Sequence, residues 1–114
     1  MSYQAPRGPS LVLITLDTTR ADRIGAYGYS GARTATIDGL AAEGALFTRA
    51  YATVPLTTPA HASMLTGLYP SKHGIHGNGD ATLPADALTI AEQLQGAGWH
   101  TAASVSAFVT TRVW

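Results

Sequence analysis

Two adjacent hydroxyl side chains, Thr57 and Thr58, stand directly before Pro59 and a run that favours helix as far as Leu65. Thr58 is a good N-cap residue, and proline suits the first position of a helix. We therefore predict a helix start here, with Thr57 just outside it. The N–H groups and positive dipole end of a helix N-terminus favour anions, including a deprotonated hydroxyl. Thr57 is the candidate catalytic nucleophile.

His61 lies one turn inside the same predicted helix and is the second candidate catalytic residue. Residues four apart share a helix face, so the imidazole can donate a hydrogen bond to Thr57 or to a substrate oxygen. Two alternatives stay open at this point. Thr57 and Thr58 could simply cap the helix, and His61 could be a packed histidine bonded to a neighbouring carbonyl.

A glycine-rich loop follows the helix, with the sequence Ser71-Lys-His-Gly-Ile-His-Gly-Asn-Gly79. Its glycines permit tight turns and the close approach of a substrate to the backbone. Three of its side chains could contact an anionic substrate. These candidate substrate-binding residues are Lys72, His73 and Asn78.

Asp17 is the candidate metal ligand, since it is a hard oxygen donor that directly follows the apolar run Leu11–Leu16. In α/β proteins, sites gather where buried strands end. A metal ion could also activate the Thr57 hydroxyl, so Thr57 is the second candidate ligand. The alternative is that Asp17 caps the turn at Thr18 and Thr19.

Strand and helix patterns alternate along the chain. Continuous or alternating apolar residues predict strands, and apolar residues three or four apart predict helices. The predicted strands are Leu11–Leu16, Leu46–Ala52 and Trp99–Val105; the predicted helices are Thr34–Glu43 ending at Gly44, the helix after Thr57, and one with Leu88, Ala91 and Leu94 on one face that stops near Gly96 or Gly98. A loop is predicted from Leu68 to Pro84. This order favours a largely parallel sheet with helices on its faces.

The segment around Thr57 resembles the signature of the sulfatase family, in which a nucleophile-x-Pro-Ser/Ala-Arg pattern precedes Leu-Thr-Gly and a proline. The residues in register are Thr57, Pro59, Ala60, Leu65, Thr66, Gly67 and Pro70. Residues 11–28 resemble the family's first strand and its metal-binding aspartate, here Asp17. Matches at Tyr69–Gly74 and Gly98–Ala102 extend the resemblance over nearly all of the chain after residue 10.

This resemblance implies an α/β fold, specifically the N-terminal portion of an alkaline-phosphatase-like sheet with helices on both faces. It also implies ester hydrolysis with a divalent metal ion as cofactor. Calcium, magnesium, manganese and zinc all stay open, because many members carry two adjacent aspartates where this chain has Asp17 and Thr18.

Two departures from the family pattern bear on the chemistry. Sulfatases proper carry Cys or Ser at the position of Thr57 and oxidise it to formylglycine; this chain has no cysteine, and we expect no formylglycine. His61 replaces the arginine of the pattern. The Thr-x-Pro-x-His arrangement resembles the nucleotide pyrophosphatase and phosphodiesterase branch of the alkaline phosphatase superfamily, whose unmodified threonine attacks phosphorus. The expected substrate is therefore a small-molecule sulfate or phosphate ester, with phosphoester hydrolysis favoured.

Length limits this interpretation, because a catalytic domain of the family is several times longer than 114 residues. We expect residues 1–10 to be an N-terminal extension and residues 11–114 to be the truncated N-terminal part of a sulfatase-like catalytic domain. The isolated chain is expected to be inactive. The alternative is a truncated or degenerate sulfatase-like protein without catalysis, at most an anion-binding module.

The composition of the chain bears on whether it binds nucleic acid or crosses a membrane. Hydrophobic residues make up 46% of the chain, charged residues 12%, and the formal net charge is zero. This balance gives no support for nucleic-acid binding. No run approaches the roughly 18 apolar residues of a membrane span, and no signal peptide is visible. We therefore expect a cytoplasmic location, and the oligomeric state stays open.

Overall fold

The structure is a computed structural model of the chain, and it describes residues 8–79 and 82–106. The described residues fall into two compact units. The first, Ile14–Tyr51, is called the α1 unit below. The second contains the described residues before Ile14 and after Tyr51 and is called the α2 unit. Each unit is described by itself.

The α1 unit contains two short 3₁₀ helices, η1 (Ala21–Arg23) and η2 (Gly25–Tyr27), and the helix α1 (Ala35–Glu43). The helix predicted over Thr34–Glu43 is therefore confirmed. Its end is also as predicted, since the Gly44 N–H donates to the carbonyl of Leu40 at 2.9 Å. Asp38 on α1 accepts a hydrogen bond from the Ala26 N–H at 2.6 Å, which ties α1 to η2.

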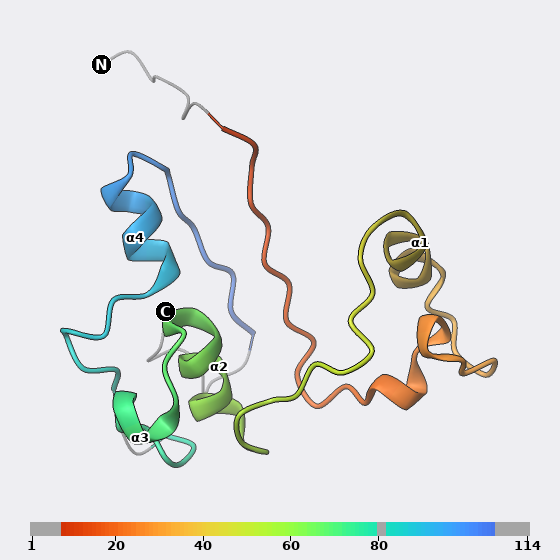
Figure 1. Cartoon of the computed structure of the whole chain (residues 1–114), viewed down its shortest axis with the longest axis horizontal. Helices are drawn as coiled ribbons and strands as arrows, with labels where there is room; N and C mark the ends of the chain where they lie inside the picture. Colours follow the sequence, from red (N-terminus) through yellow and green to blue (C-terminus); the bar gives the residue numbers. More distant parts are fainter. Residues whose placement is uncertain (1–7, 80–81, 107–114) are drawn as a thin grey trace. The chain divides into compact units, whose positions relative to one another are not determined.

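The α2 unit contains α2 (Thr57–Thr66), α3 (Pro70–His73) and α4 (Ile90–Gly96), and α2 packs against the other two (Figure 1). Its apolar core is small. Ala62 and Leu65 on α2 are buried together with Ile75, and Leu83 packs against them. Because α2 supplies most of this core, the helix that carries Thr57 is the best-anchored element of the unit.

The start of α2 lies two residues before the predicted one, because Thr58 was predicted as the N-cap and Pro59 as the first helical residue. Leu56 is the N-cap, so Thr57 lies in the first turn of the helix, rather than just outside it, and Pro59 is its third residue. The local hydroxyl cap was expected from sequence, but Asn78 caps the helix instead: its Oδ1 accepts from the Thr58 N–H at 2.9 Å. The helix ends at Gly67, whose left-handed φ of 71° suits glycine.

The loop predicted over Leu68–Pro84 contains the short helix α3, which sequence analysis missed. Its boundaries follow known preferences, with Pro70 at the first position and Gly74 in the left-handed conformation after the end. A helix of four residues is too short to show the regular spacing of apolar residues from which a helix is predicted.

Helix α4 ends at Gly96, as predicted, and begins with a capping box between Thr89 and Glu92. Leu88 was predicted on its apolar face but precedes the helix and is 58% exposed. In the described ranges, no helix combines the length and the apolar character that crossing a membrane requires.

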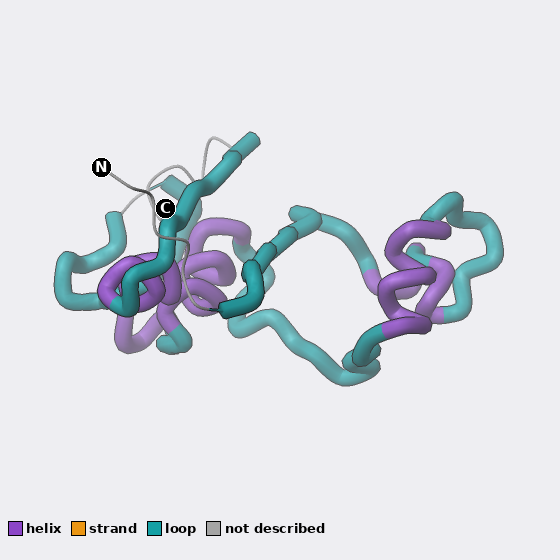
Figure 2. The backbone as a smooth tube through the Cα atoms, turned by 90° about the horizontal axis from the view of Figure 1, so that it is seen from above, coloured by secondary structure: helices purple, strands orange, loops and turns teal. Residues whose placement is uncertain are grey.

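The predicted sheet is not confirmed. Residues 8–79 and 82–106 contain helices and loops but no strand (Figure 2). The runs Leu11–Leu16, Leu46–Ala52 and Trp99–Val105 were predicted as strands and form no ladder. Val12, for example, is 76% exposed. An apolar run makes an extended segment probable, but a strand also needs a neighbouring segment whose N–H and C=O groups pair with its own.

Candidate active site

Thr57 and Asn78 meet at the N-terminus of α2. Thr57 is half-buried in the first turn, and the next residue, Thr58, is buried. The Asn78 side chain reaches this turn from 20 positions further along the chain and accepts the Thr58 N–H. The structure therefore brings one predicted substrate-binding residue to the helix end that carries the predicted nucleophile.

His61 joins the same group. Its Nδ1 lies 2.8 Å from the Thr57 carbonyl oxygen, and the ring is buried. A carbonyl oxygen can only accept, so Nδ1 carries a hydrogen and donates it to Thr57. This is the packed histidine with a carbonyl partner that sequence analysis left open as an alternative. The same bond also fixes the ring on the face of α2 that carries Thr57.

His73 lies inside the α2 unit rather than on its surface. Its Nδ1 accepts the Ile75 N–H at 3.1 Å, so in the neutral ring Nε2 carries the hydrogen, and Nε2 lies 3.1 Å from Ser63 Oγ. Ser63 Oγ also accepts from Thr53 Oγ1 at 3.0 Å. Burial, and secondarily the nearby charge of His76, lower the pKa of His73. These contacts favour a supporting role, and substrate contact by His73 stays a prediction.

Ser63 is the residue that sequence analysis missed. It is buried on α2 and links this helix to the end of α3 through His73. A polar residue within an otherwise small and apolar helical stretch is a weak signal of such a link. Nothing in the sequence identifies a partner ten positions away.

Lys72 lies in the last turn of α3 and is exposed. Its long, flexible side chain carries one positive charge at the surface of the α2 unit. No described contact joins it to the group around Thr57, so its predicted role with an anionic substrate stays a prediction.

Asp17 belongs to the α1 unit, whereas Thr57 belongs to the α2 unit. Asp17 Oδ1 accepts the Thr18 N–H at 3.0 Å, and Thr18 has a left-handed φ of 55°. The Thr19 hydroxyl lies 3.4 Å from the Asp17 carbonyl oxygen. This geometry corresponds to the turn-capping alternative. Ligation of a metal by Asp17 stays a prediction.

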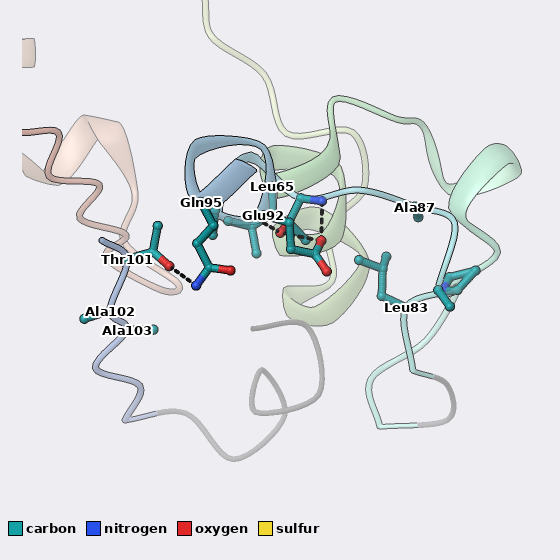
Figure 3. A pocket seen from close by; sticks show the side chains of 12 residues that line it. Leu65, Leu83, Ala87, Glu92, Gln95, Thr101, Ala102 and Ala103 are labelled. Carbon is teal, nitrogen blue, oxygen red and sulfur yellow. Dashed lines mark hydrogen bonds between the residues drawn. The ribbon is translucent and has the colours of Figure 1, made fainter. Parts of the chain in front are cut away.

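A pocket of about 430 Å³ lies between Leu65, the loop around Leu83 and the segment around Thr101 (Figure 3). Gln95 Nε2 points at Thr101 Oγ1 and donates to it at 2.8 Å. None of the predicted site residues lines this pocket. It is therefore separate from the group around Thr57.

Residues 9–109 match the family model described as Sulfatase. The chain belongs to the sulfatase family. Steryl-sulfatase of Mus musculus is 37% identical over 108 residues, which cover 86% of this chain and 17% of that protein. Ulvan-active sulfatase of Formosa agariphila is 38% identical over 97 residues, which cover 85% of this chain and 19% of that protein. Arylsulfatase A of Homo sapiens is 36% identical over 100 residues, which cover 83% of this chain and 20% of that protein. No solved structure matches the chain significantly.

The predicted family is thus confirmed. The sulfatase family is a hydrolase family with an α/β, alkaline-phosphatase-like fold, whereas the sheet predicted for this chain is not confirmed. The chain spans about a fifth of the length of the curated relatives it matches. These relatives are named as sulfatases, and none of the three is a phosphodiesterase by name.

Proposed function

We propose that this chain carries the nucleophile segment of a sulfatase-family ester hydrolase and that Thr57 is the nucleophile. One observation supports this most directly. Thr57 lies in the first turn of α2, with the His61 ring bonded to its carbonyl and the Asn78 amide on the next N–H. A hydroxyl held at the positive end of a ten-residue helix is in an environment that stabilises an alkoxide and an attacked anion.

For a phosphoester, the reaction has two steps. Thr57 Oγ loses its proton and attacks phosphorus, the Oγ–P bond forms, and the bond from phosphorus to the alcohol oxygen breaks as that oxygen takes up a proton, so that no net proton is gained or lost. Water then attacks phosphorus, which releases the phosphate product and returns the Thr57 hydroxyl. In both steps the positive end of α2 stabilises the oxygens around phosphorus. His61 holds the first turn, and Asn78 and Lys72 orient the anionic group.

The favoured ester is a phosphate. Oxidation of threonine gives a ketone, not the aldehyde that sulfatases proper derive from Cys or Ser, so Thr57 cannot supply formylglycine. A hydroxyl nucleophile without that modification fits phosphoryl transfer. Sulfate-ester hydrolysis is the second candidate, and the names of the steryl-, aryl- and ulvan-active sulfatases similar to this chain favour it.

A divalent metal ion is part of the proposal only as a cofactor that the family resemblance implies. Within the described ranges, no group of three or more His, Cys, Asp or Glu side chains comes together to hold an ion. Asp17 and the Thr57 hydroxyl are single oxygen donors in different units. Asp17 and Thr57 stay the candidate ligands of such an ion, and the two chemical steps are written without it.

The proposal is tested with the full open reading frame that contains this chain, assayed on an aryl phosphate, a bis-aryl phosphate and an aryl sulfate, with and without added divalent ions. We expect phosphoester turnover that Thr57→Ala abolishes. Thr57→Ser is the matched control, because it keeps the hydroxyl, and should retain measurable turnover. Sulfate turnover alone would favour the second candidate. No turnover of any ester would favour the non-catalytic, anion-binding alternative.

A further inference from the structure

A buried polar connection joins α2 to the loop that follows α3. It begins at Ser63 in the middle of α2, passes to His73 at the end of α3, and reaches the backbone of Ile75. Three residues later, Asn78 returns to α2 and caps its N-terminus at Thr58. The loop is therefore bonded to one helix at both of its ends.

We propose that Ser63 is a positioning residue that, through His73 and Ile75, fixes the loop so that Asn78 stays on the N-terminus of α2 beside Thr57. The catalytic consequence rests on the proposed function. The structural consequence, the placement of Asn78 on Thr58, does not.

Burial makes the Ser63 connection effective. Ser63 is 7% exposed, His73 1%, and Ile75 fully buried. Water therefore cannot readily replace the Ser63 hydroxyl as the partner of His73 Nε2. The His73 ring also has a hydrogen bond with the Pro59 backbone on α2. Removal of the Ser63 hydroxyl therefore takes away one of the two hydrogen bonds that join His73 to this helix, and the loss of a buried hydrogen bond is costly.

The loop itself has little local preference for its conformation. Gly74 and Gly79 flank Ile75 and Asn78 and have left-handed φ angles of 76° and 87°. Glycine samples such angles and many others in solution. Contacts with α2 must therefore select the conformation in which Asn78 reaches Thr58. The described contacts of this kind are the Ile75 side chain in the apolar core, the bond from Ser63 to His73 and the hydrogen bond of His73 with the Pro59 backbone.

The first test is amide hydrogen exchange in the full open reading frame, followed at Thr58 and Ile75, with the Ala62 amide in the middle of α2 as internal reference. In Ser63→Ala, exchange at Thr58 and Ile75 should accelerate about three- to tenfold, the size expected for one lost hydrogen bond. The Ala62 amide should be unaffected. Ser71→Ala is the matched control, since it removes the same hydroxyl from an exposed position on α3, and should change none of the three.

Unchanged exchange at Thr58 in Ser63→Ala would overturn the proposal. Equal acceleration at all three amides would also overturn it, because that pattern means general loosening of α2 rather than release of the loop. Neither result depends on turnover, so this test is decided even if no ester is hydrolysed.

The second test compares kcat/KM of Ser63→Ala, Asn78→Ala and the double variant on the ester that is turned over. If Ser63 acts through Asn78, the double variant should be no slower than Asn78→Ala alone, while each single variant falls roughly three- to tenfold. Multiplication of the two losses in the double variant would show independent roles and overturn the proposal. Absence of turnover in the unaltered protein would refute the proposed function and leave the exchange result to decide the placement of Asn78.

Discussion

Lowering the pH should destabilise the α2 unit through His73. The Nδ1 of this buried ring accepts the Ile75 N–H, so the neutral form is the one that fits. A second proton on the ring would lie on Nδ1, where its N–H would face the Ile75 N–H and the hydrogen bond between them would be lost. Burial of the ring and the charge of His76 lower the pKa of His73 below its ordinary value of 6.5. The folded state therefore binds this proton less readily than the unfolded chain does.

The sign and slope of the change in the free energy of unfolding with pH follow from this difference in pKa. Well above pH 6.5 the ring is neutral in both states, and its full contribution to stability is present. As the pH falls through 6.5, the unfolded chain takes up the proton first, so the free energy of unfolding decreases until the pH reaches the lowered pKa of the folded state. One proton corresponds to about 1.4 kcal/mol per pH unit at most within this window.

The assay is urea denaturation of the protein at a series of pH values from about 7.5 to 5.5, a range that brackets the ordinary histidine pKa. His73→Asn does not titrate and keeps an oxygen acceptor near the position of Nδ1. Its free energy of unfolding should therefore change less steeply with pH, by up to the slope that corresponds to one proton. His76→Asn is the matched control and should keep most of the slope. An equal slope in His73→Asn and the unaltered protein, or ring nitrogen shifts that place the hydrogen on Nδ1, would refute the reasoning.

Three further predictions concern other parts of the chain. Thr89→Ala removes the hydroxyl that accepts from the Glu92 N–H and should cost about 0.5–2 kcal/mol of stability, seen as a lower urea midpoint, whereas an unchanged midpoint would argue against the capping box. Asp38→Ala leaves the Ala26 N–H without its 2.6 Å acceptor and should speed exchange of that amide; equal protection would contradict the link between α1 and η2. Chelation with EDTA should abolish ester turnover by the full open reading frame and a divalent ion should restore it; full activity without metal would exclude the expected cofactor.

Sequence predicted the elements whose signals are local. The helix α1 has apolar residues at helical spacing and a glycine at its end, and α4 ends at a predicted glycine. The helix of the nucleophile segment was predicted, and its observed start lies two residues before the predicted one. In each case the residues that determine the element lie inside it or next to it.

Features that depend on distant partners could not be predicted. Asn78 was identified as a polar loop residue, but its position on Thr58, 20 residues earlier, follows from the path of the chain through α3. His73 was predicted as a substrate-binding residue on the loop, and its burial follows from the packing of α3 on α2. The strands predicted from apolar runs require paired neighbours, and the described residues provide no such pairing.

The central claim is that Thr57 forms a covalent intermediate during ester hydrolysis. The most direct measurement is acid quenching of the full open reading frame during turnover of an aryl phosphate, followed by digestion and mass spectrometry of the peptide that contains residues 57 and 58. One added phosphoryl group on Thr57, absent from Thr57→Ala, is the predicted result. A modified group on another residue, or undiminished turnover in Thr57→Ala, would contradict the claim.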